Sequence, residues 1–168
     1  MPRLFLLRHA KSSWDDPGLS DHDRPLAARG RHAAELMREY LSSAGIAPSL
    51  VLCSSAVRAR ETLERVAPEG ELRIEGDLYG AEEHDLLERV RLLPSHLESA
   101  MLIGHNPGMQ ELALLLAGEG EGLAQLHEKF PTGALVTLAF DEDWDALGPG
   151  AARLEAFVRP KDLEKAAL

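Results

Sequence analysis

Three short apolar runs, each followed by a stretch with helical periodicity, constrain the fold of this chain more than any other feature. They occupy residues 4–7, 50–53 and 100–104. Runs of this length are typical of strands buried on both faces, and such strands occur in parallel sheets whose connections are helices. The pattern therefore predicts an α/β fold, a three-layer α/β/α sandwich with a mostly parallel sheet.

Further elements are expected between and after these runs. The predicted helices span residues 33–44, 57–66, 81–93 and a stretch that begins at Pro107. A short strand is expected over 72–74, and alternating residues over 134–140 and 153–158 predict a hairpin. The glycines of residues 118–122 follow a helix and alternate with glutamates, so they predict a flexible loop rather than a phosphate site.

Length, charge and cysteine content limit the classes of protein to consider. A chain of 168 residues that is 45% apolar is expected to form one domain over 1–168 that buries roughly 70% of its unfolded surface. Its net charge of −10 disfavours binding to nucleic acid or to an anionic membrane. The single cysteine, Cys53, closes an apolar run and is expected to be a buried, inert thiol. A lone cysteine and an N-terminal apolar run too short for a signal peptide predict a cytoplasmic location.

Polar residues follow three of the predicted strands where those strands end. Arg8 and His9 follow the first, residues 54–60 with Arg58 follow the second, and His105 follows the third. Right-handed crossovers place the carboxyl ends of parallel strands at one edge of the sheet, so these side chains are expected to converge. Two histidines and two arginines near helix N-termini would bind a dianion such as a phosphoryl group. The sequence contains no P-loop motif.

Four motifs in this order resemble the histidine phosphatase superfamily, branch 1, which is phosphoglycerate-mutase-like. They are residues 6–10 (LLRHA), 25–30 (PLAARG), 54–62 (SSAVRARET) and 104–107 (GHNP). The Arg-His-Ala-Lys form and the segment SDHDRPL at 20–26 are most similar to the small SixA-like phosphohistidine phosphatases. The resemblance covers nearly the whole chain.

The resemblance implies a role for each of the converging residues. His9 would be the nucleophile that forms a phosphohistidine, and Arg8, Arg58 and His105 would bind the phosphoryl group. This agrees with their chemistry, since neutral imidazole is a nucleophile near pH 7 and cations offset charge on phosphoryl oxygens. Water would then attack the phosphorus, and no cofactor or metal is expected.

Two departures from the family pattern concern the residue after the nucleophile and the general acid. Ala10 replaces the usual glycine, as in SixA-like members, and Gly80 stands where mutases and broad phosphatases carry an acidic glutamate. Glu82 lies two residues further on, either as an acid or as a solvated residue in a helix first turn. Asp21 belongs to an Asp-His-Asp run that could bind a hard metal, although a role in the pocket wall is preferred.

The sequence therefore predicts a metal-independent phosphatase that hydrolyses phosphohistidine on proteins through a phospho-His9 intermediate. Its partners would be a phosphorylated protein or a small phosphorylated substrate, with no nucleic acid and no membrane. A small-molecule phosphomonoesterase or a mutase-like enzyme is the alternative within enzymes. A non-catalytic phospho-binding module is the alternative from another class.

Overall fold

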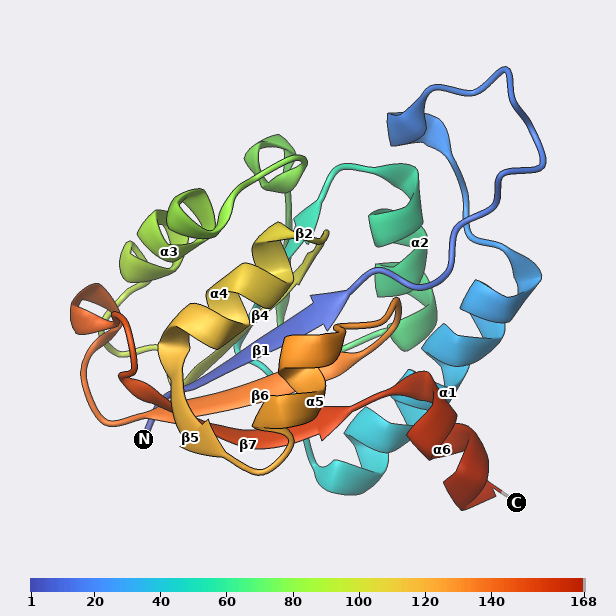
Figure 1. Ribbon diagram of the computed structural model, residues 1–168. Coiled ribbons are helices and arrows are strands. Elements are labelled where there is room, and N and C mark those ends of the chain that lie inside the picture. The colour runs from blue at the N-terminus through green and yellow to red at the C-terminus, as the bar shows by residue number, and fades with distance from the viewer. Residues whose placement is uncertain (168) are drawn as a thin grey trace.

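A seven-stranded sheet lies at the centre of the computed structural model, which describes residues 1–167 (Figure 1). Its strand order is β3-β2-β4-β1-β6-β7-β5, and β6 alone runs opposite to the others. The strands are β1 (Arg3–Arg8), β2 (Leu50–Ser54), β3 (Glu71–Glu75), β4 (Ser99–Gly104), β5 (Ala117–Gly120), β6 (Leu135–Phe140) and β7 (Ala152–Val158). The expected mostly parallel sheet is confirmed, and so is the antiparallel pairing of β6 with β7.

Helices cover both faces of this sheet. The helices are α1 (Ala28–Ala44), α2 (Val57–Val66), α3 (Glu83–Arg91), α4 (Gly108–Leu116), α5 (Leu123–Glu128) and α6 (Pro160–Ala167). Short 3₁₀ turns are η1 (Asp21–Asp23), η2 (Gly76–Leu78) and η3 (Trp144–Ala146). In Figure 1, α3, α4 and α5 lie on one side of the sheet, and α1, α2 and α6 lie on the other. No helix within residues 1–167 is both long and apolar enough to cross a lipid bilayer.

The core consists of two apolar clusters, one on each face of the sheet. In β1, Leu4 and Leu6 pack into the cluster under α3 and α4, whereas Phe5 and Leu7 pack into the cluster under α1 and α2. All four side chains are less than 5% exposed. An apolar run without polar alternation is thus explained by burial on both faces, as in other parallel sheets.

The loop predicted over 118–122 is wrong, because part of it forms β5, which pairs in parallel with β7. Gly120 has a φ of +137°, and a Cβ there would collide with the backbone of Leu154. Glycine therefore allows this edge strand to approach its neighbour closely, although the same glycines conceal the strand from periodicity analysis. The helices α5 and α6 were also not expected from the sequence pattern.

The register of the sheet places two of the predicted site segments side by side. Arg8 at the end of β1 pairs with Gly104 at the end of β4. The His9 amide continues the ladder by donating to the Gly104 carbonyl at 3.0 Å. Since β2 flanks β4 on its other side and runs in the same direction, all three strand ends meet at one edge, as predicted.

Candidate active site

His9 follows β1 directly and is nearly buried, with 7% of the residue exposed. Its Nδ1 lies 2.8 Å from the carbonyl oxygen of Ala10. Because a carbonyl oxygen only accepts hydrogen bonds, Nδ1 carries the ring proton and Nε2 keeps a free lone pair. The Ala10 amide donates to Thr62 Oγ1 at 3.0 Å, and the Thr62 hydroxyl donates to the Arg58 carbonyl at 2.7 Å. A side chain of α2 therefore ties down the backbone beside His9.

His105 follows β4 and lies next to His9, with the two ring centroids 5.1 Å apart. The Oγ of Ser54, at the end of β2, lies 2.7 Å from His105 Nε2. The same oxygen accepts the Ala56 amide at 3.2 Å, so the Ser54 proton is free to be donated to Nε2. In that arrangement Nδ1 of His105 carries the proton, and this buried nitrogen has no hydrogen-bond partner among residues 1–167.

Both imidazoles are neutral near pH 7. Burial lowers the pKa of His9 to about 3, and nearby His105 and the two arginines act in the same direction. Burial also lowers the pKa of His105 to about 4, and Arg58 is the next largest cause. The neutral ring is the nucleophilic form of histidine, so His9 does not have to lose a proton before it reacts.

Two guanidinium groups approach the histidine pair from different elements. Arg8 ends β1 and donates through Nη1 to the Phe130 carbonyl at 3.0 Å, and Asn106 donates to the same oxygen at 3.1 Å. Burial lowers the pKa of Arg8, with Arg58 contributing, but an arginine so perturbed stays cationic near neutral pH. Arg58, in the first turn of α2, donates to the Asp21 main-chain carbonyl at 2.7 Å and to its carboxylate at 3.0 Å.

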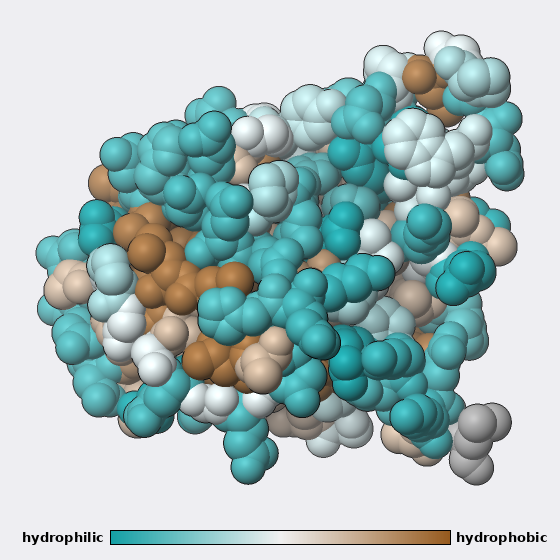
Figure 2. Space-filling model, viewed as in Figure 1, coloured by the Kyte–Doolittle hydropathy of each residue, from teal (hydrophilic) through white to brown (hydrophobic). Residues whose placement is uncertain are grey.

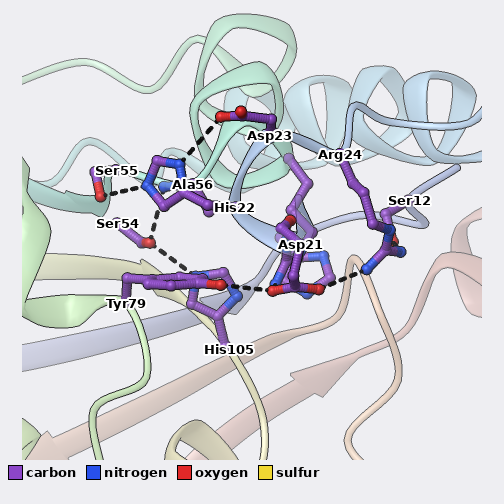
Figure 3. A network of polar contacts seen from close by, with 12 residues as sticks. Ser12, Asp21, His22, Asp23, Arg24, Ser54, Ser55, Ala56, Tyr79 and His105 are labelled. Atoms are coloured by element: carbon purple, nitrogen blue, oxygen red, sulfur yellow. Dashed lines mark hydrogen bonds and ion pairs between the residues drawn. The ribbon is translucent and has the colours of Figure 1, made fainter. Parts of the chain in front are cut away.

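Asp21 and Tyr79 form one wall of the site, as Figure 3 shows. The Asp21 carboxylate accepts the Tyr79 hydroxyl at 2.7 Å and the Arg24 Nη1 at 2.9 Å, in addition to its bond from Arg58. The bond from Tyr79, followed by those from the arginines, lowers the pKa of Asp21 to about 2. The Tyr79 ring lies edge-on to His105, with centroids 5.5 Å apart. Asp21 is therefore an ionised carboxylate near neutral pH and has no proton to donate.

The Asp21-His22-Asp23 run does not converge as a set of metal ligands. His22 Nε2 lies 2.9 Å from Ser55 Oγ, and its Nδ1 lies 3.4 Å from an Asp23 carboxylate oxygen (Figure 3). Within the described part of the chain, no three His, Cys, Asp or Glu side chains lie close enough together to hold a metal ion. The run instead contributes to the wall of the site, where the His22 ring lies edge-on to Tyr79.

Glu82 caps a helix. Its side chain accepts the backbone N–H of Asp85, and the Asp85 carboxylate accepts the Glu82 amide at 3.1 Å, which is a capping box at the start of α3. The Glu82 side chain is 70% exposed and lies 3.5 Å from His84. Gly80, at the position where the family resemblance led us to look for an acid, has a φ of +75° that favours glycine.

Some contacts of the site leave no signal in the sequence. The Phe130 carbonyl that accepts a hydrogen bond from Arg8 is a backbone atom and belongs to no motif. The contact of Ser54 with His105 and those of Tyr79 with Asp21 and His105 join residues far apart in the chain. The Cys53 thiol lies under the site in the core, where burial raises its pKa to about 12, so it is not a competing nucleophile.

The four residues predicted to converge, Arg8, His9, Arg58 and His105, do lie together at the end of the sheet. Two of their buried nitrogens, Nε of Arg8 and Nδ1 of His105, have no hydrogen-bond partner within residues 1–167. Buried polar atoms normally have partners, so this pair indicates a site built for acceptor atoms of a ligand. The free lone pair of His9 lies among groups that would bind phosphoryl oxygens.

Comparisons with known proteins agree with this geometry. Residues 4–79 match the model of the histidine phosphatase superfamily (branch 1). A solved structure from Agrobacterium tumefaciens, assigned as the phosphohistidine phosphatase SixA, is 31% identical over 95% of this chain and 99% of its own, with a TM-score of 0.82. The chain belongs to branch 1 of the histidine phosphatase superfamily. It is accordingly a phosphatase.

Two further relatives show how far this likeness extends. An uncharacterized protein of Mycobacterium tuberculosis strain H37Rv is 36% identical over 159 residues, which are 92% of this chain and all of the relative. The protein histidine phosphatase SixA solved in complex with tungstate is 23% identical, with a TM-score of 0.78 over 96% of this chain and 99% of its own. The comparison with the tungstate complex shows a shared fold over 96% of this chain.

Proposed function

We propose that this phosphatase hydrolyses phosphohistidine on proteins through a covalent phosphohistidine at His9, with no metal cofactor. The observation that carries the proposal is the bond from His9 Nδ1 to the Ala10 carbonyl, which leaves Nε2 as a free nucleophile. The resemblance of the chain to SixA-like phosphatases supports the choice of substrate. Arg8, Arg58 and His105 would bind the phosphoryl oxygens, and their charges and donors would stabilise the transition state.

The reaction would proceed by two displacements at phosphorus. In the first, Nε2 of His9 bonds to phosphorus while the bond from phosphorus to the substrate nitrogen breaks, and its electron pair stays on the leaving ring. A substrate imidazole that is already protonated on its other nitrogen leaves as the neutral ring. In the second, water attacks phosphorus, the bond to Nε2 breaks, and inorganic phosphate is released. The water proton passes to solvent or to a phosphate oxygen.

A phosphoramidate substrate is also favoured because none of the candidate residues is placed to donate a proton to a leaving group. An alkyl phosphate must expel a basic alkoxide, for which a positioned proton donor contributes about 10² to 10⁴ in rate. Asp21 is ionised, Gly80 has no side chain, and Glu82 is largely exposed and occupied as a helix cap. Phosphohistidine needs no such donor, since a ring with a pKa of about 6.5 is readily protonated at cellular pH.

A comparison of three substrates tests this proposal. We expect high kcat/KM for a phosphohistidine peptide and for p-nitrophenyl phosphate, and low kcat/KM for 3-phosphoglycerate. The metal chelator EDTA should change none of these values. Equal values for all three substrates, with a Glu82→Gln loss confined to 3-phosphoglycerate, would establish a small-molecule phosphatase instead. Activity that EDTA removes and a divalent metal restores would contradict the mechanism and implicate Asp21 and its neighbours.

Trapping of the intermediate tests the nucleophile. A phosphohistidine peptide labelled on phosphorus should transfer its label to His9 within one turnover, and His9→Ala should abolish both labelling and turnover. The fold should survive, because the substitution removes little core packing. His96→Ala, a change of the same type at an exposed site, should leave the rate unchanged. Labelling of a serine, or a wild-type rate in His9→Ala, would disprove the assignment. Vanadate binding without any turnover in the wild type would establish a phospho-binding module.

A further inference from the structure

A hollow of about 540 Å³ lies among α1, α5, α6 and the segment before β6, and Lys11, two residues after His9, is one of its lining residues. We call it the basic hollow, defined by the side chains of Lys11, Arg29, His32, Lys129, Arg159 and Lys161. We infer that the basic hollow docks an acidic segment of the phosphorylated protein substrate. This inference rests on the proposed function and names the kind of protein on which the site acts.

Positive charge is concentrated in the basic hollow far beyond the composition of the chain. The protein has a net charge of −10 and only four lysines, and three of these, Lys11, Lys129 and Lys161, line the hollow. Two carboxylates, Glu128 and Glu164, also line it, against five arginine and lysine side chains. The net negative charge would repel an acidic partner from the protein as a whole, whereas the cations of the basic hollow would attract it locally.

Most of these cations are not neutralised by the protein itself. Within residues 1–167, only Arg159 of the five takes part in an ion pair, 3.0 Å from Asp162. Lys11, Arg29, Lys129 and Lys161 are exposed and form no ion pair within 4.0 Å in the described structure. Unpaired cations at neighbouring positions repel one another, and a partner that brings carboxylates would relieve that repulsion.

Residues that line the basic hollow are close in sequence to His9 and to the segment that is hydrogen-bonded to it. Lys11 lies two residues after His9, which is at most about 7 Å of chain. On the other side, the amide of Gly133 donates to the His9 carbonyl at 2.9 Å, and the preceding Pro131 and Thr132 line the hollow. A peptide whose phosphohistidine occupies the site therefore has flanking residues within reach of these cations.

The chemistry of the basic hollow favours an acidic protein segment over a small anion. Its charges come from several separate segments, and the side chains of Lys11, Arg29, Lys129 and Lys161 are exposed rather than buried and aimed at one point. Such an array attracts a broad acidic surface and speeds its encounter with the enzyme. In Figure 2 the surface over α6 and the adjoining part of α1 is mainly hydrophilic, while apolar side chains gather over and beside α4.

Two phosphohistidine peptides of equal length, one with glutamate on both flanks and one with glutamine, test the inference. For the wild type at low ionic strength, we expect kcat/KM to be at least about 10-fold higher for the glutamate peptide, and the advantage to shrink as salt is added. The double variant Lys129→Glu/Lys161→Glu should lose this advantage. Its kcat/KM for the glutamine peptide and for p-nitrophenyl phosphate should stay within about twofold of wild type.

The control is Arg38→Glu/Arg65→Glu, which changes the net charge by the same amount on exposed residues outside the basic hollow. It should keep most of the preference for the glutamate peptide. Equal turnover of the two peptides by the wild type, or equal loss in both double variants, would overturn the inference and leave the proposed function intact. Failure of the wild type to hydrolyse either peptide, while it cleaves p-nitrophenyl phosphate, would overturn the proposed substrate and the inference together.

Discussion

A single proton decides which nitrogen of His9 can react. The Ala10 carbonyl holds the ring proton on Nδ1, so the lone pair lies on Nε2. Burial keeps the ring neutral. Burial of a polar ring also costs folding free energy, so its retention here is consistent with a functional role. Nε of Arg8 and Nδ1 of His105 have no hydrogen-bond partner within residues 1–167, which is understandable if a ligand supplies their acceptors.

Arg58→Ala should weaken vanadate inhibition by roughly 2 kcal/mol, because it removes a charge-assisted pair to the bound anion. Inhibition constants for wild type and variant measure this directly. The matched control is Arg65→Ala on the same helix, where the arginine is exposed and paired with Glu35. We expect no change there. Equal inhibition constants for all three proteins would mean that Arg58 does not bind the anion.

At the scale of elements, the site depends on where strands end and helices begin. The sheet ladder carries His9 and His105 to adjacent positions, while α2 supplies Arg58 and, through Thr62, the contact that holds the backbone beside His9. The 3₁₀ turn η1 then brings Asp21 over Arg58. The helix α3 stands apart from this machinery, and its first residues serve its own capping.

Glu82→Ala should lower the free energy of unfolding by about 1 kcal/mol, because it removes one half of the capping box of α3. It should leave kcat/KM unchanged for every substrate. Glu82→Gln is the matched variant, since the amide oxygen can still accept the Asp85 N–H while the carboxylic acid is gone. Urea unfolding and kinetics on both variants provide the measurement. A loss of turnover without loss of stability would mean that Glu82 works as an acid.

At the level of the whole molecule, an acidic protein holds a local cationic site at one edge of a sheet whose two faces are each covered by an apolar cluster. Burial lowers the pKa of both His9 and His105, so neither ring gains a proton easily. The same burial keeps His9 nucleophilic and makes the stability of the fold depend on pH. The cost of burial is offset by the large core on both faces of the sheet. Stability should therefore depend on pH in a direction that these two groups determine.

The free energy of unfolding should fall as the pH is lowered from about 6.5 to about 4. In the unfolded chain both histidines bind protons near pH 6.5, whereas in the native state their pKa values are about 3 and about 4. The unfolded state therefore binds more protons in this window, and native stability is lost as the pH falls. The total loss is on the order of several kcal/mol.

Urea unfolding at several pH values checks this dependence. His9→Gln should flatten the curve between pH 6.5 and 4, because it removes one of the two groups that cause it. His96→Gln, at an exposed position, should not. Parallel curves for wild type and His9→Gln would show that His9 titrates normally in the native state.

Local sequence patterns were sufficient to predict β1, β2, β4 and α2, together with the convergence of Arg8, His9, Arg58 and His105. These elements have strong local signals, namely short apolar runs and helical spacing, and the topology of parallel strands brings their ends together. The motifs in the chain also indicated the superfamily. Local pattern was enough here because strands that are buried on both faces of a sheet consist of continuous apolar runs, which are easily recognised in a sequence.

Three features become visible only in the folded protein, namely the tautomer of His9, the hydrogen bond from Arg8 to the Phe130 carbonyl, and the pairing of Asp21 with Tyr79. These contacts join residues far apart in the chain or involve backbone atoms, which are the same in every residue and leave no pattern. The strand β5 escaped prediction because its glycines have no side chains to alternate. The basic hollow escaped for a similar reason, since its lysines are scattered along the chain and gather only when α1, α5 and α6 pack around the end of β1.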